Sequence, residues 1–238
     1  MVEGAGSKQA FAQRLGQWVS FTDAITLHSA LDAGTAPASC EPSAAQSCAE
    51  TANHAAVKAE FLRVRAAMVD LINRGCSPTP GAARIKFPVP QPDVPQELVT
   101  AYSPFHRFFL ALQKEMDAAV GSLRAKVRQT LAAASPELGQ LAALDAALAQ
   151  ILGDRERRLL ATVPVLLEKR FAQLLKAHQQ ALAGSGQVDD PAAWMRPGAW
   201  LANFRDELRA VLLAELDLRL QPVMGLIETF GNEAIGQT

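Results

Sequence analysis

The sequence predicts an all-α protein, a helical bundle of five to seven helices with two irregular linkers. Large apolar residues recur every three or four positions over most of the chain, as one face of a helix requires. Ala and Leu, the strongest helix formers, supply most of the 49% hydrophobic residues. Serine, proline and glycine stand where these periodic stretches begin and end, so the pattern defines individual helices.

Two helices are predicted in the N-terminal third. The first covers residues 7–31, and Trp18 in its apolar stripe is expected in the core. The second covers 50–74 and stops at Gly75, a residue type common just after a helix end. Residues 34–49 between them are mainly Ala, Ser, Pro and Cys, so the sequence predicts a linker there.

Residues 77–97 hold six prolines and form the second predicted linker. Proline lacks the amide hydrogen that a helix needs, and this density favours an extended backbone. Two interpretations stay open, a surface connector and a docking segment for a partner. If the segment is ordered, we expect it to lie along a groove between helices with Ile85, Phe87 and Val89 pointing inward.

The remaining helices follow from Ser-Pro starts and Gly or Pro stops. The predicted ranges are 105–134, 136–152 ending at Gly153-Asp154, 155–183 with a kink at Pro164, a short turn around Trp194, and 198–220 with helix resuming after Pro222 to Phe230. These elements suggest three stretches, an N-terminal helical pair at 1–76, the linker at 77–97 and a C-terminal bundle at 98–238, packed as one unit.

The helix at 198–220 has the densest apolar pattern in the chain. Because its apolar residues cover more than one face, we expect it at the centre of the fold with Phe204 and Leu208 buried. Its Glu215 and Arg219 are four residues apart, the preferred order for a helical ion pair, worth about 0.3 kcal/mol if exposed.

Composition and charge restrict the function classes. A net charge of −1 gives no general attraction for nucleic acid or an acidic membrane surface. No run of about 18 apolar residues predicts a membrane span, and the first fifteen residues contain no secretory signal. The three cysteines, Cys40, Cys48 and Cys76, are an odd number without an export signal, so we expect a reducing, cytoplasmic compartment.

The sequence offers no catalytic, cofactor-binding or metal-ligating residue. Its four histidines stand alone, and Cys40 and Cys48 are too far apart for the usual zinc spacing. The glycine patterns of phosphate-binding loops and of hydrolase nucleophiles are missing. Neither catalysis nor metal binding is therefore expected.

Binding to a protein partner is the function that the sequence favours. The candidate partner-binding residues are Trp194, Arg196, Arg155 and Arg158. Tryptophan and arginine are the side chains that most often anchor interfaces. Trp194 lies near a Gly/Ser loop and is expected at the surface, whereas Trp200 is expected in the core. The arginines at 155 and 158 alternate with acidic residues, a mixture typical of a solvated helix start.

Three segments carry a resemblance to a known family: 15–31 (LGQWVSFTDAITLHSAL), 102–128 (YSPFHRFFLALQKEMDAAVGSLRAKVR) and 212–227 (LLAELDLRLQPVMGLI). Together they resemble an uncharacterised proteobacterial family, domain of unknown function 3348, over most of the chain. The family has no established activity, so the resemblance supplies no catalytic residue. It implies a cytoplasmic accessory subunit of a membrane-associated assembly similar to ion-driven motor complexes.

We therefore expect a non-enzymatic adaptor that binds a helical protein partner, in that motor-like setting if the resemblance holds. Two alternatives stay open, a nucleic-acid-linked regulator and an enzyme with an unrecognised pocket in the bundle. The regulator would need a basic face, and the basic stretches at 124–128 and 155–158 are thin. Nucleic acid and direct membrane insertion are not expected, no cofactor is expected, and self-association stays open.

Overall fold

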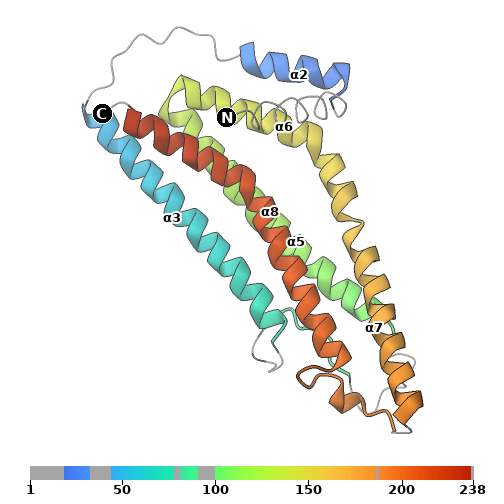
Figure 1. Cartoon of the computed structure of the whole chain (residues 1–238). Coiled ribbons are helices and arrows are strands. Elements are labelled where there is room, and N and C mark those ends of the chain that lie inside the picture. Colours follow the sequence, from blue (N-terminus) through green and yellow to red (C-terminus); the bar gives the residue numbers. More distant parts are fainter. Residues whose placement is uncertain are drawn as a thin grey trace, which may run out of the picture. The chain divides into compact units, whose positions relative to one another are not determined.

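The computed structural model describes residues 19–32, 44–77, 81, 83–90, 100–185 and 188–236. Within these ranges the chain is all-α, as predicted, and its α-helices fall in the expected range of five to seven (Figure 1). The helices are α2 (Phe21–Asp32), α3 (Ala44–Gly75), α5 (Ser103–Ala134), α6 (Pro136–Leu160), α7 (Val163–Ser185) and α8 (Trp200–Gly236), with a short 3-10 helix η1 (Pro191–Ala193) before α8. The predicted core position of Trp18 lies outside the described residues.

The helices form two compact units. Unit 1 comprises Met1–Lys58, Arg124–Leu160 and Gly225–Thr238, and unit 2 comprises Ala59–Leu123 and Ala161–Met224. Three helices, α3, α5 and α8, therefore contribute residues to both units. The three stretches expected from sequence divide the chain by composition, and they remain a prediction about domains.

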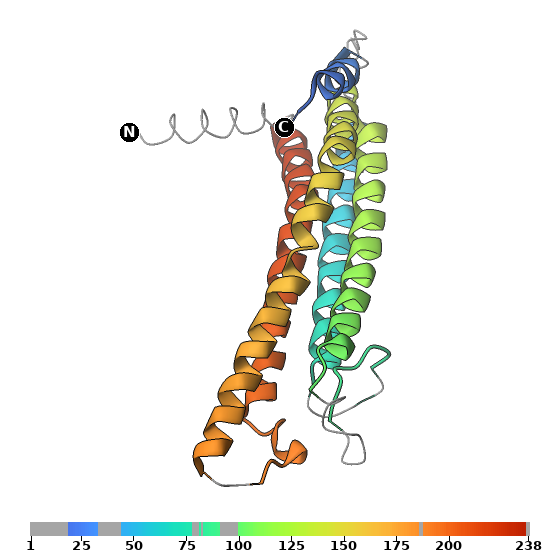
Figure 2. The same cartoon turned by 90° about the vertical axis from the view of Figure 1, so that its right-hand side faces the viewer.

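The core of unit 2 is built on α8. In Figure 1 this helix lies between α3 and α7 with α5 behind it, and Figure 2 shows α5 beside α3. Its large apolar side chains, spaced three or four apart, are completely buried: Leu201, Phe204, Leu208, Leu212 and Leu216. The predicted burial of Phe204 and Leu208 is thus confirmed.

Aromatic rings fill the end of unit 2 where α5 and α8 begin. Phe171 of α7 lies 5.1 Å from both Phe105 and Phe204, measured between ring centroids. The Tyr102 hydroxyl donates to the carbonyl of Pro164 at 2.8 Å. Such ring pairs add about 0.5–1.5 kcal/mol each to the burial of their surface, so this cluster fixes the first turns of α5, α7 and α8 together.

In the described part of the Pro-rich segment, Phe87 is the buried apolar contact with the helices, and Arg84 pairs with Glu115 of α5. The Phe87 ring is 4% exposed and lies 5.1 Å from Phe105, and the Phe87 amide donates to the carbonyl of Gly75 at 2.9 Å. Ile85 is half-buried. The expectation that Val89 points inward is wrong, because Val89 is 53% exposed.

Unit 1 joins the end of α5 to α6. The Ser135 side chain caps α6, accepting from the amide of Leu138 at 3.1 Å, as the Ser-Pro start predicts. Arg124 and Arg128 of α5 both bind Asp145 of α6, with Nε–Oδ2 distances of 2.8 and 2.6 Å. The short helix α2 lies along α6 in Figure 1.

The last turns of α8 pack against α3 in unit 1. The ring of His54 meets that of Phe230 edge-on, with 5.6 Å between centroids. Next to it, a Cβ atom at Gly231 would lie 2.8 Å from Nε2 of His54, so only glycine fits there without displacing the imidazole.

Several predicted helix boundaries are wrong. Helix α3 begins at Ala44, so the last six residues of the predicted linker 34–49 are helical, while 33–43 lie outside the described residues. Helix α6 continues through Gly153 to Leu160. The break expected at Gly153-Asp154 falls instead at residues 161–162, because an isolated glycine weakens a helix by only about 1 kcal/mol.

The two prolines of the C-terminal half also behave differently from expectation. Pro164 lies in the first turn of α7, where an amide hydrogen has no helical partner, so it starts the helix and does not kink it. Pro222 lies inside α8, which continues to Gly236. The interruption predicted at Pro222 is therefore not seen.

Candidate functional site

One side of α3 in unit 2 carries an apolar stripe whose first two residues, Leu62 and Ala66, are exposed. Leu62, Ala66 and Val69 follow one another at spacings of four and three residues, so they share one face of the helix. Leu62 is 55% exposed. Val69 is half-buried, and Ile72, three residues further on, is fully buried, so the stripe runs from exposed Leu62 toward the core.

A hollow of about 520 Å³ lies over this stripe. Its lining residues are Leu62, Arg65, Ala66, Val69, Asp70 and Asn73. The floor is therefore aliphatic, and it is bordered by one positively charged, one negatively charged and one neutral polar side chain. Ligand-binding hollows with this character bind an apolar surface and use the polar rim for orientation.

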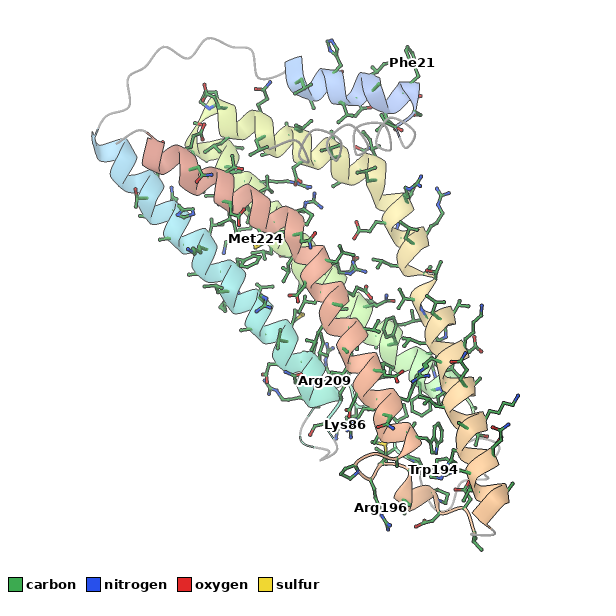
Figure 3. All side chains as sticks on the ribbon, in the orientation of Figure 1. Phe21, Lys86, Trp194, Arg196, Arg209 and Met224 are labelled. Carbon is green, nitrogen blue, oxygen red and sulfur yellow. The ribbon has the colours of Figure 1, made fainter. Side chains whose placement is uncertain are left out.

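Polar contacts join α3 to α8 beside the hollow. Arg65 Nη2 lies 3.1 Å from Asp217 Oδ1, and Arg209 Nε donates to Asn73 Oδ1 at 2.7 Å. Figure 3 shows Arg209 and Met224 on the side of α8 that faces α3. Because the Arg65 and Asp217 side chains are half exposed to water, their ion pair adds little to stability, on the order of 0–1 kcal/mol.

A polar network that centres on a buried carboxylate joins α5 to α8 in unit 2. Glu215, only 5% exposed, accepts from Gln113 Nε2 at 2.9 Å and from Arg219 Nε at 2.9 Å. Arg219 also binds Asp117 of α5 at 2.8 Å. The predicted pairing of Glu215 with Arg219 is present, but it is buried and not a surface pair. A buried pair of this kind fixes how the two helices align.

The expectation that Trp194 lies at the surface is wrong. Its ring is 1% exposed and lies 5.1 Å from Trp200, which is buried as predicted. The indole Nε1 donates to Asp189 Oδ1 at 2.7 Å, and the same oxygen lies 3.0 Å from His178 Nε2. Asp189 thus satisfies the polar edge of Trp194 and lets the whole ring enter the core.

The three candidate arginines do lie at the surface. Arg196 is exposed in the connection before α8, with Nη2 4.0 Å from Asp190 Oδ2, and Figure 3 shows it near Trp194. Arg155 and Arg158 are exposed near the end of α6. Arg196 belongs to unit 2 and the other two belong to unit 1, so they do not form one site within either unit.

Burial affects two titratable groups of unit 2, the Cys76 thiol and the Tyr102 hydroxyl. Burial raises the pKa of the Cys76 thiol to about 12, an effect that outweighs the nearby Arg209 and Arg205, so the thiol stays neutral at physiological pH. Burial, with a smaller contribution from Glu168, likewise raises the pKa of Tyr102 to about 12. Within the described ranges, no three His, Cys, Asp or Glu side chains stand close enough to hold a metal ion.

Sequence reasoning missed the α3 hollow. The stripe of α3 that the apolar spacing emphasises is the core-facing one, and Ala66 gives little signal of its own. Leu62, Ala66 and Val69 recur at spacings of four and three, so a second stripe could have been read from the sequence.

The fold and the site define a helical bundle protein with an apolar, mixed-charge hollow on an outer helix and a polar network locked between two inner ones. The chain belongs to the family described as "Protein of unknown function (DUF3348)", which matches residues 1–232. The resemblance seen in the sequence is thereby confirmed. No curated protein and no solved structure matches the chain.

Across the described residues, no helix combines the length and the apolar character that crossing a membrane would require. The longest helix, α8, has 37 residues but carries charged side chains along its length.

Proposed function

We propose that the protein is a non-enzymatic adaptor that binds a helix of a protein partner in the hollow on α3. The observation that supports this proposal is the stripe of exposed Leu62 and Ala66 and half-buried Val69 on the floor of that hollow. An exposed large apolar side chain in a hollow on a helix face is a common sign of an interaction surface.

The shape of the stripe favours a helical occupant. Its three residues span two turns of α3, and a second helix laid alongside would meet them with its own residues at spacings of three and four. In this mode of recognition the partner helix is amphipathic and places its apolar face in the groove. Ala66 in the middle of the stripe leaves room for a large partner side chain.

The charges at the hollow add a second requirement on the partner. Arg65 and Asp70 stand along the floor at five residues' separation, so the rim offers one positive and one negative group. A partner helix would therefore carry charges of both signs beside its apolar stripe. The cytoplasmic, membrane-associated motor-like setting implied by the family resemblance belongs to the same proposal.

Site-specific photo-crosslinking in the native host tests the proposal. A photoreactive phenylalanine at Leu62 should give a protein adduct, whereas the same residue at Val165, which is 50% exposed on α7, should not give it. Mass spectrometry of the crosslinked peptide should show an amphipathic helical sequence, and Leu62→Asp should reduce capture at least about tenfold, as expected for a desolvated anchor.

Three outcomes would contradict the proposal. These are adducts of the same protein in equal yield at Leu62 and Val165, an adduct with nucleic acid at Leu62, and an adduct only with a second copy of the chain. The matched control Val165→Asp places the same charge on an equally exposed apolar position and should leave capture unchanged.

A further inference from the structure

The last turns of α8 are anchored in unit 1 by apolar contacts with one polar exception. Leu226, Ile227 and Phe230 are buried, and Phe230 packs against His54 of α3. One turn further on, Glu233 brings a carboxyl group into the same packed region. Glu233 is half-buried, and one of its two carboxyl oxygens is shielded from water.

The surroundings of Glu233 do not suit a carboxylate. Its Oε2 atom is buried and has no hydrogen-bond partner among the residues that the structure describes. The hydroxyl of Ser135 forms a hydrogen bond with this carboxyl group. A charged oxygen buried without a partner costs several times more than a neutral one, because it gives up the strong hydration of the ion.

The charged neighbours of Glu233 are of its own sign. Glu50 of α3 and Glu137 of α6 face it from the two helices packed against this end of α8. Arg124 and Arg128 of α5, in the same unit, are both bound to Asp145. Like charges on three helices oppose one another, and taking up a proton at one of them removes that repulsion.

We propose that Glu233 is a proton-operated latch that holds the end of α8 in unit 1 when it is protonated and loosens it when it is ionised. Protonation removes the buried charge, ends the repulsion from Glu50 and Glu137, and supplies an O–H that can donate to Ser135. Ionisation restores the buried charge and the repulsion from Glu50 and Glu137. The end of the helix can avoid both only by moving the carboxylate into water.

The direction of the effect follows from the shift of the carboxyl. Burial first, and then Glu137 and Glu50, raise the pKa of Glu233 above its usual 4.5, while the Ser135 hydroxyl opposes them. A group with a raised folded-state pKa stabilises the fold below the unfolded value and loses that contribution as pH rises through the folded value. The latch is therefore closed in acid and opens as pH rises above 4.5.

Hydrogen exchange followed by mass spectrometry tests the latch on the full chain. After correction for the intrinsic pH dependence of exchange, amides of residues 225–233 should lose protection as pH rises, by about tenfold for each unit of pKa shift. Glu233→Gln, which is always neutral, should keep its protection at every pH. Glu228→Gln removes an exposed carboxyl from the same helix and should behave as wild type.

The proposal is overturned if Glu233→Gln loses protection with pH as steeply as wild type. Protection in wild type that is constant or rises with pH would overturn it too. Glu137→Gln provides a second measurement that leaves Glu233 itself in place. Because it removes one repelling charge, it should make the loss of protection shallower and shift it to lower pH.

Discussion

Helices α3 and α8 run through both units, yet they use their apolar residues differently in unit 2. On α8, Leu201, Phe204 and Leu208 are fully buried. On α3 between 59 and 75, Ile72 alone reaches full burial, while the large neighbours in its stripe are half-buried and Leu62 is 55% exposed. Helix α8 is thus an internal element. Helix α3 is an outer helix, and one of its sides stays in part exposed to solvent.

The difference shows that the apolar residues of a helix do not all contribute to the stability of the fold. On α8 the large aliphatic residues return at every turn, and even Glu215 is drawn into the interior and paired there. On α3 they alternate with alanine and arginine, so each turn buries little. Stability should therefore depend on α8, and partner binding on α3.

The largest expected effect that tests this comparison is at Phe204. Phe204→Ala should lower the free energy of unfolding by about 3–5 kcal/mol, because it removes a fully buried ring and leaves a cavity. Urea denaturation followed by circular dichroism measures the loss. Leu218→Ala, at a position 53% exposed on the same helix, should cost under about 1 kcal/mol. Equal losses in the two variants would contradict the internal position of α8.

The polar network on α8 should produce the next largest effect. Arg219→Met removes a charge-assisted hydrogen bond from the buried Glu215 carboxylate and leaves the one from Gln113, so it should cost about 1.5–3 kcal/mol. Combining it with Glu215→Leu removes the uncompensated charge and should restore most of that loss. If the single variant unfolds at the same urea concentration as wild type, the network has no share in holding α5 to α8.

The ion pairs of Asp145 with Arg124 and Arg128 in unit 1 test whether polar contacts also stabilise helix packing away from α8. Burial raises the pKa of Asp145, but hydrogen bonds from Arg124 and Arg128 outweigh it and hold the pKa below the usual 3.8. The resulting contribution to stability is present above the unfolded-state pKa and is lost as pH falls through the folded-state pKa. Asp145→Asn should therefore flatten the acid side of a stability–pH profile.

A control for Asp145 comes from the same helix. Asp154 pairs with Arg157, but both side chains are largely exposed. Asp154→Asn should leave the acid side of the profile unchanged. If the two asparagine variants have the same profile, the Asp145 pair contributes no more than a surface ion pair.

The smallest expected effect is on α3 itself. Leu62→Ala should change the free energy of unfolding by no more than about 0.5 kcal/mol, because the leucine is already more exposed than buried. Ile72→Ala, on the buried side of the same helix, should cost about 2–4 kcal/mol. A large loss at Leu62 would show that its surface is needed for folding and is not free for a partner.

Sequence reasoning succeeded where one strong pattern decided the outcome. The stripe of α8 and the cap at Ser135 are local features, and the structure has them as predicted. It failed where the structure of a residue depended on contacts with other parts of the chain. Trp194 is buried because Asp189 accepts its indole hydrogen, and Gly153 stays helical because neighbouring turns compensate its low propensity.

The candidate site was less accessible to sequence than the fold. Exposure of Leu62 depends on which other helices approach α3, and helix periodicity says only which residues share a face. The predicted arginines at 155, 158 and 196 are at the surface, but nothing in their sequence context placed them in different units. Periodicity identifies stripes, and only the packed structure distinguishes a covered stripe from a free one.

The close approach of Gly231 to His54 has a consequence for the history of the family. Each position restricts the volume available to the other, so a change at one site is tolerated only with a compensating change at its counterpart. We expect relatives that carry alanine or serine at position 231 to carry a smaller residue at position 54. In an alignment of the family, this steric constraint would appear as correlated substitutions at positions 54 and 231, which are 177 positions apart in the chain.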